Sequence, residues 1–495
     1  MSAVTVQAVD THRRRETAAA LAAILPAHAL LHTDEAVKPY ECDGLSAYRQ
    51  PPMVVALPET EEQVQAILKT CHRLQVPVVA RGAGTGLSGG ALPSGDGVLL
   101  VLAKFMRILD IDPLGRTARV QPGVRNLAIS EAVAQHGLYY APDPSSQIAC
   151  SIGGNVAENS GGVHCLKYGL TVHNILAVRA VTIEGELLEI GSAALDSAGY
   201  DLLALLTGSE GLLAVVTEVT VKLLPKPDCA QVVMAAFDDV EKAGNAVANI
   251  IAAGIIPAGL EMMDQKAIVA VEPFVKAGYP TDAAGLLLCE SDGTREEVDE
   301  EIARMEAVMQ TSGAHLIRTS RDEAERLRFW AGRKAAFPAV GRISPDYYCM
   351  DGTIPRKHLA EVLRGIEAME KKYGLRCANV FHAGDGNLHP LILYDANQPG
   401  ELERTEAFGG EILDLTIKVG GTITGEHGVG VEKVGHMCAQ FAPKELAVFR
   451  AIKATFDEHA LLNPGKAVPT LHRCAEFGRM HVHAGQTAHS DLPRF

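Results

Sequence analysis

The stretch RGAGTGLSGG (residues 81–90) lies between two short apolar segments and decides how the first half of the chain folds. VPVVAR (76–81) before it and GVLLVL (97–102) after it are runs of the kind that form buried strands. Residues 84–89 match the G-x-G-x-x-G dinucleotide fingerprint, which requires a helix to follow, and the next residues, ALPSGDG, predict none. The sequence therefore excludes a Rossmann-type NAD site. Because the glycines let backbone N–H groups approach a phosphate, we interpret the stretch as a diphosphate-binding loop rather than a flexible turn.

Outward from this loop, short strands and helices alternate as far as Pro225 and Pro227, where the pattern changes. EEQVQAILKTCHRLQ (61–75) has the 3.6-residue apolar spacing of a helix. After residue 228 the alternation is typical of an antiparallel sheet with helices on one face. We predict an α+β fold in four parts: an N-terminal helix and arm (1–50), a nucleotide-binding module of two subdomains (51–227), a cap domain (228–460) and a segment that returns to the nucleotide (461–495).

The composition is that of a globular protein with more than one domain. The chain has 495 residues, more than a single hydrophobic core usually supports, and 47% of them are hydrophobic. A net charge of −15 and a single Trp argue against a nucleic-acid partner, which needs basic surface and stacking rings. The ten cysteines form no CxxC pair, so we expect no iron–sulfur cluster held by this chain alone and a cytoplasmic location with reduced thiols.

Two terminal segments carry misleading signals. RRRETAAALAAIL (13–25) superficially matches a twin-arginine export signal, but Glu16 and Pro26 favour an amphipathic helix. No stretch approaches the 18 apolar residues of a membrane span, so we expect membrane contact only through a partner. The tail is rich in histidine but fits no zinc template, and we interpret it as a surface or partner-contact segment. Its residues of this kind are His472, Cys474, His481, His483 and His489.

Three more segments share the character of the first loop. PDPSS (142–146) precedes SIGGNVAENSGG (151–162), and TGSEG (207–211) follows. Glycines beside small polar residues offer backbone donors with no side chain in the way. Each segment alone could be structural. Together with the first loop, however, they indicate one long ligand lying across several loops, as a dinucleotide would.

FHAGDGNLH (381–389) and GEHG (425–428) are the stretches most suited to chemistry. Gly-Asp-Gly predicts a tight turn between His382 and His389, which would bring both imidazoles to one side of adjacent strands. Two imidazoles and a carboxylate are a common ligand set for a divalent metal, whereas the alternative is a pair of partly buried, hydrogen-bonded histidines. Because a second glycine-flanked loop carries a Glu-His pair, we favour a metal site.

These motifs together resemble the FAD-binding domain of the vanillyl-alcohol oxidase superfamily, and GEHGVGVEK with NPGK resembles the C-terminal domain of FAD-linked 2-hydroxy-acid dehydrogenases. The resemblance extends from about residue 30 to the C-terminus. ECDGLSAYR (41–49), GVHCLKYGLTVHN (162–174) and RISPDYYCMDGTIPR (342–356) make the chain similar to FAD-bearing subunits of that family. The resemblance implies non-covalent FAD, since the loop at 81–90 contains no His for a covalent flavin bond.

The resemblance also implies roles for individual residues. His382, His389 and Glu426 match the relatives' ligands for a divalent transition metal (Zn, Mn or Fe). His427 matches their catalytic base, which would remove the substrate's hydroxyl proton. Arg333 matches their carboxylate-binding arginine, although the sequence alone allows a helix-surface charge equally well. We expect FAD contacts from Arg81, Gly82, Gly84, Thr85, Gly86, Leu87, Ser88, Gly89, Gly90, Asp143, Ser145, Gly153, Gly154, Asn155, Gly161, Gly162, Gly208, Ser209, Glu210, Gly211, Asn387 and Asn463.

The implied function is oxidation of a short 2-hydroxy acid, such as glycolate to glyoxylate, by hydride transfer to FAD. Phe337, Cys349 and Leu391 stand where the 2-hydroxyglutarate relatives have polar residues, which favours a monocarboxylate, with D-lactate as the alternative substrate. A non-catalytic flavoprotein scaffold is the alternative of another class, and the complete set of motif residues argues against it. By resemblance, electrons would pass to a second flavoprotein subunit and an iron–sulfur subunit, and the chain would lie at the inner face of the plasma membrane only through these partners.

Overall fold

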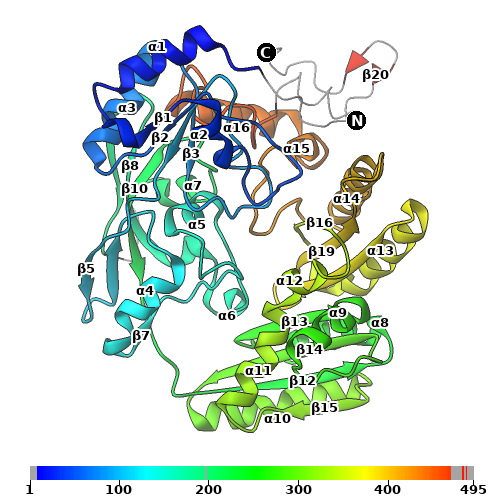
Figure 1. Cartoon of the computed structure of the whole chain (residues 1–495). Coiled ribbons are helices and arrows are strands. Elements are labelled where there is room, and N and C mark those ends of the chain that lie inside the picture. The colour runs from blue at the N-terminus through cyan, green and yellow to red at the C-terminus, as the bar shows by residue number, and fades with distance from the viewer. Residues whose placement is uncertain (1–7, 195–197, 470–481, 484–485, 488–495) are drawn as a thin grey trace. The chain divides into compact units, whose positions relative to one another are not determined.

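The computed structural model describes residues 8–194, 198–469, 482–483 and 486–487. The chain divides into two compact units, and Figure 1 colours it from the N-terminus to the C-terminus. Unit 1 contains residues 1–160, 170–225 and 427–495, and unit 2 contains residues 161–169 and 226–426. Each unit has its own β-sheet core and its own helices, which confirms the predicted α+β fold.

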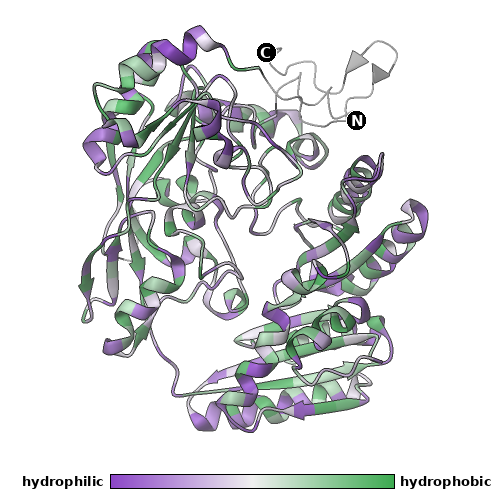
Figure 2. Cartoon of the chain, in the orientation of Figure 1, coloured by the Kyte–Doolittle hydropathy of each residue, from purple (hydrophilic) through white to green (hydrophobic). Residues whose placement is uncertain are grey.

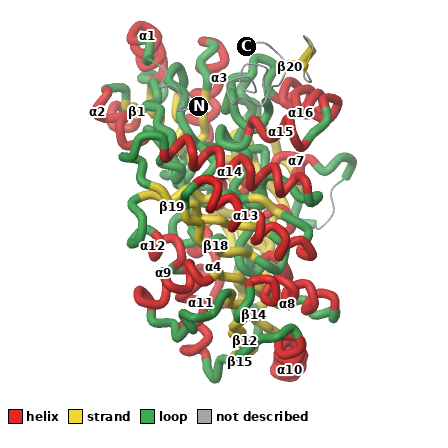
Figure 3. The backbone as a smooth tube through the Cα atoms, turned by 90° about the vertical axis from the view of Figure 1, so that its right-hand side faces the viewer, coloured by secondary structure: helices red, strands yellow, loops and turns green. Residues whose placement is uncertain are grey.

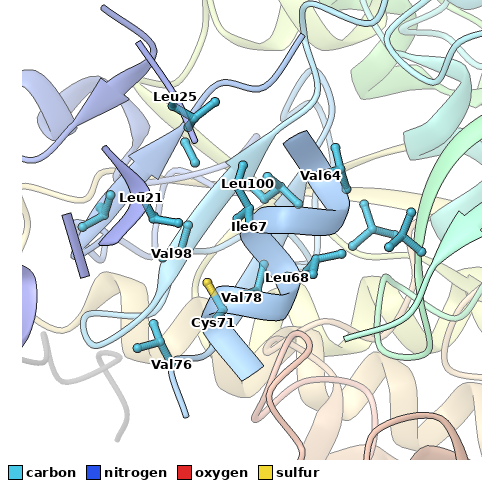
Figure 4. Close-up of a cluster of buried hydrophobic side chains, with 14 of the residues drawn as sticks. Leu21, Leu25, Val64, Ile67, Leu68, Cys71, Val76, Val78, Val98 and Leu100 are labelled. Atoms are coloured by element: carbon cyan, nitrogen blue, oxygen red, sulfur yellow. The ribbon is translucent and has the colours of Figure 1, made fainter. Parts of the chain in front are cut away.

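The first sheet of unit 1 is built from the apolar segments that flank the glycine-rich stretch. It has the order β1-β2-β4-β3, and β4 pairs in parallel with both β2 and β3. The strand bounds are Leu30–Leu31 (β1), Val54–Ala56 (β2), Val78–Arg81 (β3) and Val98–Val101 (β4). The predicted helix is α3 (Glu61–Leu74), and Figure 4 shows Ile67 and Leu68 packed among side chains of these strands in a buried cluster.

The second sheet of unit 1 is antiparallel and has the order β5-β6-β10-β8-β9. Its bounds are Ile108–Asp112 (β5), Thr117–Val120 (β6), Val215–Lys222 (β10), Ile175–Val181 (β8) and Leu187–Gly191 (β9). Every second residue of β10 is buried, so one face of the sheet supplies a second core. Helix α5 (Ile152–Glu158) buries Ile152 and Val156 in that core.

The remaining elements of unit 1 are short. The helix predicted near the N-terminus is α1 (Thr11–Leu21), which buries Ala18 and Leu21 in the first core. The others are α2 (Asp34–Val37), α4 (Asn126–Val133), β7 (Leu138–Tyr139), α7 (Leu202–Leu206), β11 (Leu224–Pro225), α15 (Val434–Gln440) and α16 (Pro443–Phe456).

Unit 2 is built on one antiparallel sheet, as the sequence pattern after residue 228 predicts. The strand order is β15-β12-β14-β13-β18-β19-β16, with β17 also paired to β19. The bounds are Cys229–Phe237 (β12), Gly259–Asp264 (β13), Gly285–Gly293 (β14), Leu316–Thr319 (β15), Asp346–Cys349 (β16), Gly352–Thr353 (β17), Arg376–His382 (β18) and Asn387–Tyr394 (β19). Strands β18 and β19 form the hairpin that carries the two motif histidines, with Val380 opposite His389.

The helices of unit 2 are amphipathic elements packed on this sheet and on one another. Figure 3 shows α13 (Leu359–Tyr373) beside α14 (Glu401–Lys418), and Figure 2 shows α13 with hydrophilic and hydrophobic colour on opposite sides. The others are α6 (Cys165–Tyr168), α8 (Val240–Ala252), α9 (Gln265–Val275), α10 (Arg295–Thr311), α11 (Glu323–Lys334) and α12 (Ala336–Val340).

One segment lies in a different unit from the predicted one. Residues 161–169 were expected in the nucleotide-binding module but belong to unit 2. From here on, we call only this segment the arm, not the N-terminal segment within residues 1–50. The reason is polar pairing: Lys167 Nζ lies 2.6 Å from Asp292 Oδ1, and His164 Nε2 lies 3.1 Å from Glu290 Oε1. These partners lie on β14, so long-range contacts that no local pattern reports assign the arm to unit 2.

The chain also returns to unit 1 earlier than the predicted boundary at residue 461. Residues 427–460 belong to unit 1 because α16 packs against its second core. The buried Lys453 of α16 donates hydrogen bonds to the carbonyls of Leu212 (2.6 Å) and Leu462 (2.8 Å). Residues 461–463 then run along β3, where Val78 N–H donates to the Leu461 carbonyl at 2.8 Å.

Two sequence expectations concern membranes and the tail. Within the described residues, no helix is both long and apolar enough to cross a membrane. Of the predicted partner-contact tail, the structure describes only the paired strands β20 (Val482–His483) and β21 (Gln486–Thr487). His472, Cys474, His481 and His489 lie outside the described residues.

Candidate active site

The first glycine-rich loop, in unit 1, has the properties that a phosphate-binding loop needs. Residues 82–97 between β3 and β4 contain no helix, which confirms the exclusion of a Rossmann-type site. Among the described residues, none of the N–H groups of residues 82–90 donates a hydrogen bond to another protein atom. Arg81, at the end of β3, donates to the Cys42 carbonyl at 2.6 Å. A run of N–H groups without protein acceptors fits the diphosphate of FAD.

The second and third glycine segments of unit 1 behave differently. Gly153 and Gly154 lie inside α5, and the Gly153 N–H donates to the Pro122 carbonyl at 2.8 Å. The N–H groups of Gly208 and Glu210 donate to α5 carbonyls at 2.8 Å each. These N–H groups therefore bond to other parts of the protein, whereas the N–H groups of the first loop can bond to a ligand.

Several predicted FAD contacts lie around that loop or before α5. Asn463 donates from its amide to the carbonyls of Gly90 (3.0 Å) and Glu210 (2.6 Å), so its side chain braces the loop. Asp143 and Ser145 lie in the segment between β7 and α5, the first half-buried and the second exposed. The structure thus brings Asn463 to the first loop although the two are far apart in sequence.

Unit 2 brings the three predicted metal ligands together. His389 Nε2 lies 2.8 Å and His382 Nε2 lies 3.3 Å from the same oxygen of Glu426, and all three side chains are buried. The other Glu426 oxygen accepts a hydrogen bond from the Gly161 N–H of the arm at 3.0 Å. Two imidazole nitrogens and a carboxylate converging on one point can hold a divalent transition metal, and the buried donor set fits such an ion.

Glu261, which the sequence analysis did not single out, joins the cluster to Arg333. Its Oε1 lies 2.7 Å from His382 Nδ1, and its Oε2 lies 2.8 Å from an Arg333 terminal nitrogen. A carboxylate on the far ring nitrogen of a histidine fixes the ring orientation and makes the other nitrogen a better ligand. Its place between the apolar residues Leu260 and Met262 of the strand GLEMMD (259–264) was the signal that could have revealed it.

Arg333 is not a helix-surface charge. It lies on α11 with 1% of its surface exposed, and its Nε has no hydrogen-bond partner among the described residues. Burying a guanidinium with an unused donor is costly unless an anion completes its contacts. The arrangement fits a site that binds a carboxylate.

A second acid missed by the sequence analysis holds the loop that carries Glu426. The buried Asp351 accepts hydrogen bonds from the N–H groups of Gly425 (3.0 Å) and Glu426 (3.3 Å). Asn387, a predicted FAD contact on β19, has a buried side-chain oxygen without a hydrogen-bond partner in the described part of the chain, and so has Thr353. A Cβ added at Gly425 would overlap both of those side chains, so the loop lies directly on them.

The charged groups of the cluster shift one another's pKa values towards the charged forms of Glu426 and His382. Burial alone would raise the pKa of Glu426, but hydrogen bonds from His382 and His389 lower it well below its usual value. Burial would likewise lower the pKa of His382, and the charges of Glu261 and Glu426 raise it well above its usual value. Asp385, in the turn of the β18–β19 hairpin, is half-buried, and desolvation raises its pKa to about 6. The two histidines therefore favour the charged form of Glu426, which suits a cation.

His427 follows Glu426 directly in the chain but belongs to unit 1. It is half-buried, and its carbonyl oxygen accepts a hydrogen bond from the Ser88 hydroxyl at 2.7 Å. Consecutive Cα atoms across a trans peptide are about 3.8 Å apart, so the peptide bond keeps His427 next to Glu426.

A loop of unused N–H groups in one unit and a His–His–Glu cluster with a buried arginine in the other are features of a flavin-dependent oxidoreductase. Residues 52–191 match the family described as FAD binding domain, and residues 226–467 match the family described as FAD linked oxidases, C-terminal domain. The chain belongs to the FAD-linked oxidase family, which confirms the resemblance found in the sequence.

Curated relatives agree with this assignment. The chain is 66% identical to the glycolate oxidase subunit GlcD of Escherichia coli strain K12, over 95% of this chain and 94% of the relative. It is 40% identical to GlcD of Bacillus subtilis strain 168, over 86% and 91%. A D-lactate dehydrogenase of Anaerostipes hadrus is more distant, at 32% identity over 88% and 93%.

Solved structures share the fold. A p-cresol methylhydroxylase aligns with a TM-score of 0.82 and 18% identity, covering 94% of this chain and 98% of that one. A 4-ethylphenol oxidase from Gulosibacter chungangensis aligns with a TM-score of 0.75 and 17% identity, covering 92% and 97%. At these identities the likeness establishes the fold alone.

Proposed function

We propose that this chain is the flavin-bearing subunit of a 2-hydroxy-acid dehydrogenase that oxidises glycolate to glyoxylate. The observation that carries the proposal is the connection, through Glu261, between a His–His–Glu cluster and a buried arginine in a chain 66% identical to a glycolate oxidase subunit. A cation site and an arginine that are connected through Glu261 suit a substrate with a hydroxyl and a carboxylate on neighbouring carbons.

FAD, when bound, supplies the acceptor for the hydride of the substrate carbinol carbon. The N–H groups of residues 82–90 would hold its diphosphate, and the loop contains no His for a covalent bond. We therefore propose non-covalent FAD. Gly208 and Glu210 would act mainly by holding α5 and the neighbouring loops in place, since their N–H groups are occupied by α5.

His382, His389 and Glu426 would hold a divalent transition metal. Such an ion would stabilise negative charge on the substrate hydroxyl oxygen as its proton leaves. Glu261 fixes the His382 ring, and the Gly161 N–H fixes the second oxygen of Glu426. We propose that the two contacts set the direction of the ligand atoms.

Arg333 would bind the substrate carboxylate. Its buried Nε and terminal nitrogens offer a two-point contact that a lysine cannot reproduce. Cys349 and Leu391 are opposite each other in the β16–β19 pair and both are buried, so neither offers a charge to a second carboxylate. This supports a short monocarboxylate. D-lactate remains the second candidate, because relatives named D-lactate dehydrogenase also match over most of the chain.

His427 would take the hydroxyl proton. An imidazole has an unperturbed pKa near neutrality, and a general base of this kind is needed where the substrate hydroxyl ionises.

The reduced flavin must then pass its electrons on. We propose a second flavoprotein subunit and an iron–sulfur subunit as acceptors, with the chain on the cytoplasmic side of the plasma membrane only through them.

Anaerobic mixing of the purified chain with a panel of hydroxy acids tests the proposal. Glycolate should bleach the flavin spectrum fastest, D-lactate more slowly and D-2-hydroxyglutarate least. Acid precipitation of the same sample should leave yellow flavin in the supernatant. A chain that holds FAD but is reduced by no member of the panel would instead be a non-catalytic flavoprotein scaffold.

A further inference from the structure

Glu210 of unit 1 uses its whole carboxylate to hold the main chain that follows His427. One oxygen accepts the Val429 N–H at 2.6 Å, and the other accepts the Gly430 N–H at 2.7 Å. The residue is buried, and its own backbone is fixed at both ends by Ala157 and Asn463. A buried carboxylate with two N–H donors is a strong, directional anchor.

Ser88 holds the same segment from a second point. Its hydroxyl donates to the His427 carbonyl at 2.7 Å, and its carbonyl accepts the N–H groups of Val431 and Glu432 at 3.1 Å each. The buried Lys433 adds a third contact by donating to the Gly428 carbonyl at 2.9 Å. Residues 427–432, which we call the histidine loop, are therefore fixed along their entire length within unit 1.

The histidine loop has no room to shift. Gly428 and Gly430 both have left-handed backbone angles, with φ values of +78° and +53°. A Cβ at Gly428 would overlap the Glu158 carboxylate, and one at Gly430 would overlap the Ser88 carbonyl. The loop is thus enclosed by the residues that hold it, and only glycine permits this approach.

We propose that Glu210 and Ser88 are positioning residues for His427. This inference rests on the proposed function, in which His427 removes the substrate hydroxyl proton. Two hydrogen-bonded anchors on the main chain fix the point and direction from which the imidazole leaves the backbone. Misplacing a catalytic group by about 1 Å can cost about 100-fold in rate, so anchors of this kind are part of the catalytic machinery although they touch no substrate.

The test is rapid-mixing measurement of flavin reduction by glycolate in the FAD-loaded full chain. Glu210→Gln places an NH2 group against one of the two N–H donors and should lower the limiting reduction rate about 10- to 100-fold. Ser88→Ala removes one hydrogen bond and should cost about 10-fold. FAD content and the half-saturating glycolate concentration should stay within about twofold, because both variants keep the backbone N–H groups of the loop at 81–90. Glu218→Gln, which removes an ion pair with Arg119 on the strands β6 and β10, is the matched control and should reduce at the normal rate.

A double-mutant cycle separates positioning from general loosening. In a His427→Ala background, Glu210→Gln should cause no further loss, because the group it positions is gone. An equal loss with and without His427 would overturn the positioning role, and so would loss of FAD or weaker saturation in both Glu210→Gln and Ser88→Ala. If His427→Ala alone reduces flavin at the normal rate, the proposed base is wrong, which is a separate failure. If Glu210→Gln does not fold, the same cycle with Ser88→Ala and His427→Ala tests the proposal.

Discussion

Glu426 and Glu290 of unit 2 have surroundings opposite to those of Glu158 in unit 1. In unit 2, hydrogen bonds from basic groups outweigh burial and lower the pKa of Glu426, and His164 and Arg326 do the same for Glu290, bringing its pKa to about 2. In unit 1, burial raises the pKa of Glu158 well above its usual value, and the neighbouring Glu210 raises it further. Glu426 and Glu290 are therefore kept charged, whereas the surroundings of Glu158 favour keeping its proton.

This difference separates two uses of a buried carboxylate. An acid that stays charged away from water requires a cation, which can be a histidine, an arginine or a metal ion. An acid surrounded by other acids and by backbone N–H groups supports the chain instead, as Glu210 supports the histidine loop. Glu426 of unit 2 thus represents the first use, and Glu210 of unit 1 represents the second. The variants below test that separation, from the largest expected effect to the smallest.

Replacing His389, one of the proposed metal ligands, should have the largest effect on flavin reduction. We expect His389→Ala to lose the bound metal and to lower flavin reduction by glycolate about 1,000-fold, since a cation at the reacting oxygen contributes several kcal/mol. Elemental analysis of chelator-free protein gives the metal content independently of activity. The exposed His315→Ala is the control. A variant that retains stoichiometric metal would remove His389 from the ligand set.

The pH dependence of the free energy of unfolding tests whether the buried Glu290 is charged. Its ordinary pKa near 4.5 is lowered to about 2 in the folded chain, so its contribution to stability is complete above about pH 4.5 and is lost as the pH falls through about 2. We expect Glu290→Gln to cost about 3 kcal/mol at pH 7 and to flatten the acid limb of the stability curve. Urea unfolding between pH 2 and pH 7 measures both. The exposed Glu300→Gln should lose stability at low pH as the parent chain does. If Glu290→Gln loses as much stability at low pH as the parent chain, Glu290 is not a charged, stabilising group.

Arg333 tests whether unit 2 also attracts an anion. Arg333→Ala should raise the half-saturating glycolate concentration about 30-fold, which corresponds to about 2 kcal/mol for a charge-assisted two-point contact. Arg333→Lys should recover only part of that loss, because an ammonium lacks the planar fork. Rapid mixing over a concentration series measures saturation, with the exposed Arg342→Ala as control. Unchanged saturation in Arg333→Ala would exclude it from the substrate site.

Glu158 should give the smallest effect, with the opposite sign. Its pKa is raised in the folded chain, so the proton it holds stabilises the fold at low pH and this contribution is lost as the pH rises through the folded value. Glu158→Gln cannot ionise and should be more stable than the parent chain at pH 9 by about 1 kcal/mol, with the gap closing towards pH 4.5. Thermal unfolding across this range, with the exposed Glu131→Gln as reference, decides it. A variant less stable than the parent at pH 9 would mean that Glu158 is charged in the fold.

Local patterns predicted several helices and strands and the hairpin that carries two of the candidate site residues. Glycine density identified the loop at 81–90, and the Gly-Asp-Gly turn correctly placed His382 and His389 on a hairpin. Glu261 and Asp351 were missed because their partners come from distant strands and loops, which a linear pattern does not relate. An acid inside an apolar strand was the available signal, since burial of a lone carboxylate requires a partner.

The arm has a consequence for how substrate preference could be transferred between members of this family. Residues 161–169 are encoded far from the rest of unit 2, yet Tyr168 and Lys167 both bind Asp292, and Gly161 binds Glu426. A chimera that exchanges only residues 226–426 would join a foreign sheet to the resident arm and break these pairs. The interchangeable module is therefore discontinuous, and recombination that preserves it needs four crossover points rather than two.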